Sequence, residues 1–195
     1  MTVLVRLGAV ESRRFGFELV KPSSVVVTGS GSESATVSAL GSVEFSAATG
    51  LSLNDVFSSG YDNYMVVMSG TSSAGDLGIQ LRYRASGTDA SGSDYTHQRI
   101  VAQSTTISGA RSSSQTAAIF GFWSPTLKNG DVAYIYGPAL AQPTASRNVN
   151  VDTSGSATII DYAATHSLST AYDGFTMFVG ANSITGRVAV YGMRG

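Results

Sequence analysis

The chain has 195 residues, and its 12 Lys and Arg residues against 13 Asp and Glu residues give a formal net charge of −1. A near-neutral chain lacks the basic surface that binding to DNA or RNA requires, which excludes nucleic acid as the main partner. The absence of cysteine excludes disulfide scaffolds and thiolate metal sites. Only 13% of the residues are charged and 22 are glycine, a composition that favours β-rich structure over amphipathic helices.

The first 21 residues differ from the rest of the chain. They contain four basic residues against two acidic ones, and Pro22 separates them from the first predicted strand. We interpret residues 1–21 as an N-terminal arm or adapter and residues 22–195 as one β-sandwich domain. An ordinary first strand of the domain fits this segment equally well, because Val3, Val5 and Leu7 would share one of its faces. The segment has no long apolar run, so we expect synthesis in the cytoplasm and no membrane partner.

The hydrophobic pattern of the remaining chain has a period of two, which predicts β-strands. It is clearest over residues 77–84, where Leu77, Ile79 and Leu81 alternate with polar or small residues. Residues 51–57 carry the one pattern that suggests a helical turn. Further strands are expected at residues 25–28, 35–39, 43–47, 64–68, 95–102, 116–123, 132–136, 148–152, 158–163, 175–179 and 188–192. We expect a core that includes Tyr64, Val66, Met68, Leu77, Ile79, Leu81, Val188 and Val190.

Turn-forming residues separate these strands. The sharpest hairpin signal is Asn129-Gly130, because both residues tolerate a positive φ, and we expect it to join strand 119–123 to strand 132–136. Many short strands with regular turns predict an all-β fold, namely a two-sheet antiparallel sandwich of jelly-roll type.

The titratable residues do not form the pattern of an active site. His97 and His166 each lie alone in a strand-like stretch, and neither a nucleophile elbow nor a phosphate-binding loop occurs. The aspartates lie mostly at turns, where their side chains bond nearby backbone N–H groups. The loop 87–94 offers oxygen ligands but lacks the bidentate glutamate of an EF-hand. The sequence therefore predicts no enzyme, no catalytic residue, no cofactor and no metal site.

Four aromatic residues leave two interpretations open. Tyr95, Trp123, Tyr134 and Tyr136 lie in predicted strands. Flat amphipathic rings bind sugar faces well, so these residues suit a glycan-binding platform. At this spacing they are also typical of a core or of a contact between subunits.

Two stretches resemble a family of small bacteriophage virion proteins with β-sandwich domains. The first is residues 62–70 followed by 77–89, and the second is residues 174–179 followed by 184–192. The resemblance covers about residues 23–195 and describes a scaffold without catalytic residues. It implies a jelly-roll-like fold and a role as a minor structural, tail-fibre or capsid-decoration protein.

Together these observations predict a non-enzymatic accessory protein of the bacteriophage virion, displayed on the head or the tail. It would act through interfaces with other virion proteins, and the resemblance implies a homotrimer, since phage fibres and decorations are often threefold. The alternatives are a tail-fibre module that binds host-surface glycans and a tail enzyme that degrades polysaccharide. The arm would attach the protein to the particle through Val3, Val5, Arg6, Leu7, Arg13, Arg14, Phe15 and Phe17.

Overall fold

A computed structural model describes residues 16–126, 128–152 and 158–194. All the regular secondary structure of these residues is β, and all the strand pairs are antiparallel, which confirms the predicted class. Within this described part no helix is long and apolar enough to span a membrane.

The residues that the structure describes form fourteen strands. They are β1 (Gly16–Val20), β2 (Ser24–Val37), β3 (Val43–Asn54), β4 (Asn63–Ser72), β5 (Leu77–Ala85), β6 (Thr88–Asp89), β7 (Tyr95–Gln103), β8 (Thr106–Gln115), β9 (Ala118–Trp123), β10 (Asn129–Tyr136), β11 (Thr144–Asp152), β12 (Thr158–His166), β13 (Gly174–Phe178) and β14 (Ile184–Arg194).

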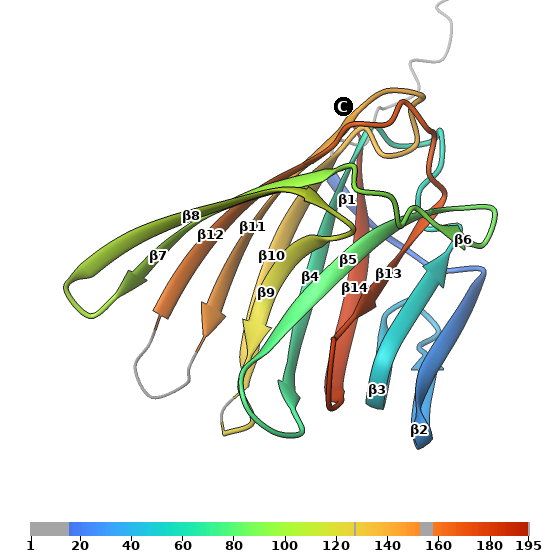
Figure 1. Cartoon of the computed structure of the whole chain (residues 1–195). Helices are drawn as coiled ribbons and strands as arrows, with labels where there is room; N and C mark the ends of the chain where they lie inside the picture. Colours follow the sequence, from blue (N-terminus) through green and yellow to red (C-terminus); the bar gives the residue numbers. More distant parts are fainter. Residues whose placement is uncertain (1–15, 127, 153–157, 195) are drawn as a thin grey trace, which may run out of the picture.

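Hydrogen bonds join all the strands into one curled sheet. The main path runs β6-β5-β13-β3-β14-β4-β10-β11-β12-β7-β8, while β1 pairs with β14, β2 with β3 and β9 with β5. The curl brings β5 and β9 in front of β4 and β10 (Figure 1), and β9 contacts β10, β11 and β12 across the core. The expected two-sheet jelly roll is therefore not confirmed, because the two layers belong to one continuous sheet.

The core lies between these layers. Seven of the eight predicted core residues are at most 1% exposed, and Leu77, at the start of β5, is half-buried. Aromatic side chains fill much of the remaining space. Phe45 stacks on Trp123, and Phe57 contacts both Tyr64 and Phe175.

Two local predictions are wrong. Asn129-Gly130 forms no hairpin, because β9 pairs with β5 and the two residues begin β10. The Asn129 side chain is buried and donates hydrogen bonds to the carbonyl oxygens of Gly70 and Ser124. Residues 51–57 form no helical turn, because residues 51–54 continue β3 and the first three of them pair with β13.

The described end of the N-terminal segment belongs to the sheet. Residues 16–20 form β1, which runs antiparallel to β14 from Gly16 opposite Arg194 to Val20 opposite Val190. An exposed ion pair between Glu18 and Arg194, at 2.9 Å, connects the same two strands. Residues 1–15 lie outside the described part of the chain.

Candidate functional site: an apolar outer face

The most unusual surface lies on five neighbouring strands, β10, β11, β12, β7 and β8. One face of these strands is turned toward β9 and the core, and we call the opposite one the outer face. Residues paired across antiparallel strands share a face, so the register defines two adjacent rows on the outer face. One row is Val132, Val149, Asp161, Ile100 and Gly109, and the next is Gly130, Val151, Ile159, Ala102 and Ile107.

Six large aliphatic side chains in these rows are open to solvent, and we call them the apolar patch. Their exposed fractions are 77% for Ile107, 56% for Ile159, 54% for Ile100, 44% for Val151, 40% for Val149 and 36% for Val132. They are six of the twelve exposed large hydrophobic residues in the described part of the chain, so they are clustered rather than scattered. Together they expose on the order of 500 Å² of apolar surface, the scale at which a patch marks an interaction site.

The inner face of β11, in the middle of these strands, is polar. The buried residues of β11 are Thr144, Ser146, Asn148 and Asn150, while Val149 and Val151 alternate with them on the outside. This inverts the usual pattern, in which apolar side chains point to the core and polar ones to water. The alternation of Asn and Val was the signal in the sequence, but period two alone does not say which set is buried.

The polar inner face holds β9 in place. The Asn150 side chain accepts a hydrogen bond from the Phe122 backbone N–H at 3.2 Å and donates one to the Phe122 carbonyl oxygen at 3.3 Å. It thereby satisfies both backbone groups of a β9 residue as a neighbouring strand would. The Trp123 indole Nε1–H donates to Asp131 Oδ2 at 2.5 Å, and both side chains are buried.

Gly121 allows this close approach of β9. A Cβ atom at Gly121 would lie 2.1 Å from Asp131 Oδ1 and 3.2 Å from Asn150 Nδ2. Any side chain would therefore displace the carboxyl group that Trp123 needs. Asp131 of β10 and Asn150 of β11 are thus committed to polar contacts with β9, and the valines that alternate with them lie on the outer face.

Two charged residues beside the apolar patch neutralise each other, whereas Arg111 on β8, opposite Gln98, adds a positive charge to the outer face. Arg147 and Asp161 form a two-pronged ion pair, with Nε to Oδ1 at 3.0 Å and Nη2 to Oδ2 at 2.5 Å. The carboxylate of Asp161 raises the pKa of the Arg147 guanidinium. Because the two charges satisfy each other, the centre of the apolar patch needs no charged partner.

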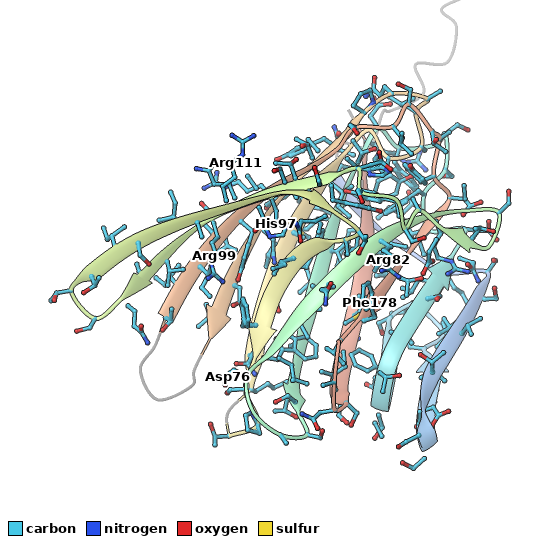
Figure 2. All side chains as sticks on the ribbon, viewed as in Figure 1. Asp76, Arg82, His97, Arg99, Arg111 and Phe178 are labelled. Atoms are coloured by element: carbon cyan, nitrogen blue, oxygen red, sulfur yellow. The ribbon has the colours of Figure 1, made fainter. Side chains whose placement is uncertain are left out.

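The β7–β8 hairpin carries the patch beyond the body of the protein (Figure 1). Eight of the ten residues of β8 are exposed, and β8 pairs only with β7. In Figure 2, Arg111 points away from the body, whereas His97 and Arg99 lie on the side of β9. The Arg99 guanidinium lies 5.7 Å from the centre of the Phe122 ring and connects the hairpin to β9.

Both histidines belong to the interior. His166 is fully buried, its Nε2 lies 2.5 Å from the Tyr172 hydroxyl, and its ring stacks on Tyr95 at 4.2 Å. His97 is 7% exposed. Burial lowers the pKa of both rings, and the nearby positive charge of Arg99 lowers that of His97 further. Among the described residues no group of three His, Cys, Asp or Glu side chains is placed to hold a metal ion.

The four predicted aromatic residues do not form one platform. Tyr95 and Trp123 are fully buried, which corrects their assignment to a surface site. The Tyr95 hydroxyl donates to the Ala90 carbonyl oxygen at 2.9 Å and accepts from the Tyr83 backbone N–H at 3.1 Å. Tyr134 and Tyr136 lie on the outer face of β10, half-buried and 43% exposed respectively. They adjoin the apolar patch.

Of the predicted attachment residues, the structure describes only Phe17. It is 55% exposed on β1. The other seven, namely Val3, Val5, Arg6, Leu7, Arg13, Arg14 and Phe15, lie outside the described residues.

A shallow groove of about 470 Å³ lies over β2, β3 and β14. Its described lining includes Ser34, Glu44, Lys128 and Arg187, and its one aromatic residue among the described ones, Phe45, is 3% exposed, so it offers no open ring for a sugar to stack on. The Arg187 guanidinium donates a hydrogen bond to the Ser42 hydroxyl oxygen at 2.8 Å.

Comparisons with protein-family models and with curated proteins find no match for this chain.

Proposed function

We propose that this chain is a non-enzymatic structural protein of a bacteriophage virion that acts through protein–protein interfaces. The observation that carries the proposal is the apolar patch on the outer face, which clusters six exposed Val and Ile side chains and has the size of surface patches that commonly serve binding. The bacteriophage assignment is supported by the resemblance of residues 62–89 and 174–192 to small virion proteins. The same resemblance supports a jelly-roll-like ancestry for the curled sheet and a location on the head or tail.

The energetics of the apolar patch agree with a contact surface. Covering about 500 Å² of apolar surface contributes on the order of 10 kcal/mol before costs are counted. Association costs a similar amount in lost translational and rotational freedom, so further contacts must supply the net affinity. Tyr134, Tyr136 and the polar residues around the apolar patch are placed to provide them.

We propose that residues 1–15 carry an attachment arm and that the domain begins with β1. The pairing of residues 16–20 with β14 supports this boundary. A deletion of residues 1–15 should leave a folded protein that no longer joins particles. A deletion that also removes residues 16–20 should lower stability, since it takes a strand away from β14. Full incorporation of the shorter deletion would place attachment elsewhere.

The test of the function uses purified particles. A labelled antibody should locate the protein on intact virions, and mass spectrometry should find it in them. The double variant Ile100→Lys/Ile159→Lys should fold but be depleted from particles, because two charges interrupt the apolar patch. Leu40→Lys is the matched control, since Leu40 is 78% exposed and lies far from these rows in the sheet. Absence of the protein from particles, or equal incorporation of both variants, would contradict the proposal.

The glycan-binding alternative retains only Tyr134 and Tyr136 as exposed or half-exposed rings. Binding of a host polysaccharide that is lost in Tyr136→Ala would favour it over the structural role. The polysaccharide-degrading alternative has no observation in its favour among the described residues.

A further inference from the structure

We infer that the partner covering the outer face is a second copy of this chain, so that two copies pack outer face to outer face around a twofold axis. The inference rests on the proposed function in treating the outer face as an interface, and it adds the identity of the partner. Three features of the described surface support it.

The first feature is the width and shape of the apolar patch. It extends across five strands, about 19 Å from β10 to β8 at the usual strand spacing. A broad sheet face of Val and Ile packs well against another sheet face, with the side chains interleaved between layers about 10 Å apart. A second copy supplies a face of this width and composition. A single helix or extended peptide would leave part of the patch uncovered.

The second feature is charge. Arg147 and Asp161 neutralise each other within one chain, so two apposed outer faces bring no unpaired charge together from this pair. Each copy has a net charge of only −1, so long-range repulsion between copies is weak. A strongly basic or acidic partner would find no matching charge at the centre of this surface.

The third feature is the β7–β8 hairpin. β7 is held by β12 along its whole length, but β8 ends the described sheet and eight of its ten residues are exposed. Ile107 and Ile100, on its two strands, are among the most exposed members of the apolar patch. A second copy packed against the outer face would cover both residues and hold the hairpin. The patch and the polar residues around it would then approach the roughly 800 Å² per partner of a stable interface.

The experiment is light scattering on the purified full-length chain over a range of concentrations. The wild-type protein should have twice the 20.1 kDa mass of one chain, because two identical faces packed against each other close a twofold dimer. A mass of three chains would contradict this packing and would agree instead with the homotrimer that the resemblance implies. Ile100→Lys/Ile159→Lys should shift it to the mass of one chain, with an apparent dissociation constant raised roughly 100-fold or more. Val26→Lys is the control, because Val26 is 50% exposed on β2, outside the apolar patch. Circular dichroism should show all three proteins folded.

A cysteine variant tests the same surface independently, since the natural chain has no cysteine. Val149→Cys places a thiol at the centre of the apolar patch and should form disulfide-linked dimers under mild oxidation. Leu40→Cys should not. A wild-type monomer at all concentrations would overturn the inference, as would an oligomer that both lysine variants leave intact. If the wild type is monomeric and the lysine double variant is nevertheless depleted from particles, self-association fails while the proposed function survives with another virion protein as partner.

Discussion

The hydrogen bond between Trp123 and Asp131 offers a direct test of how β9 is held against the sheet. The indole Nε1–H donates to Asp131 Oδ2 at 2.5 Å, and Asn148 Nδ2 approaches Oδ1 of the same carboxyl group at 3.4 Å. Asp131 is 2% exposed and Trp123 is fully buried, so water cannot easily replace a lost partner. The perturbation is Asp131→Ala, compared with Trp123→Phe and with the double variant.

The expected magnitudes follow from burial. Asp131→Ala leaves the buried indole N–H of Trp123 without its acceptor. It also removes the carboxyl oxygen to which the Asn148 amide donates. A buried unsatisfied donor costs about 1–3 kcal/mol, and hydrogen bonds to charged groups contribute about 1.5–3 kcal/mol. We therefore expect Asp131→Ala to lower the free energy of unfolding by about 3 kcal/mol. Trp123→Phe removes the donor but keeps an aromatic ring beside Phe45, so we expect it to cost about 2 kcal/mol.

The assay is urea denaturation followed by far-ultraviolet circular dichroism, because Trp123 is the only tryptophan and its fluorescence is lost in one variant. The two effects should not add. Once one partner is gone, removing the other should cost at least about 1 kcal/mol less than in the wild type. Strict additivity of the two losses, within about 0.5 kcal/mol, would refute the view that this contact holds β9.

Three further predictions concern stability. Leu81 is fully buried and pairs with Met177 and Ala118 of the neighbouring strands. Leu81→Ala should therefore lower the free energy of unfolding, measured by denaturant titration, by about 2–5 kcal/mol. An unchanged melting temperature would contradict the place of Leu81 in the core. Burial lowers the pKa of His97 and His166, so below pH ~6.5 the unfolded chain binds protons that the folded chain resists. The melting temperature should therefore fall from pH 7 to pH 5, and this dependence on pH should be weaker in His97→Gln/His166→Gln. An equal dependence in the double variant would show that other groups cause it. Chelator should leave the melting temperature unchanged, whereas a loss restored by calcium would reveal a metal site in the loop 87–94.

Much of the fold follows from local chemistry that the sequence displays. Period-two alternation identified most of the strands and nearly all of the expected core, because β4, β5 and β14 each bury one apolar face in the ordinary way. It missed β8, whose Ser- and Gly-rich residues show no apolar alternation. Pairing between distant strands was not readable. Asn129-Gly130 has the residues of a tight turn, yet tertiary contacts place it inside a strand, where the Asn129 amide bonds two carbonyl groups. Strand pairing depends on such long-range contacts, which turn propensity does not encode.

The candidate surface was hidden for a related reason. In β11 the alternation of Asn and Val is plain, but the rule that apolar residues face the core selects the wrong face. The structure buries Asn148 and Asn150 next to β9, which pairs with β5 on one side and leaves backbone groups on its other side in need of partners. At Phe122 the Asn150 amide bonds both the backbone N–H and the carbonyl oxygen. Without knowing that β9 lies against β11, the sequence gives no reason to bury an asparagine.

The inverted strand also bears on why this chain would need a partner. A shift of one residue in the register of β11 would turn Val149 and Val151 inward and Asn150 outward. In an isolated monomer that shift would cover the valines, but it would leave the Phe122 backbone groups without the Asn150 amide. The observed register keeps those bonds and exposes the valines instead. Covering the outer face removes the cost of that exposure, so the contact that stabilises the interface also favours the register in which β9 is correctly held. An interface here would therefore stabilise the fold itself, and dissociation should lower the melting temperature in a concentration-dependent way.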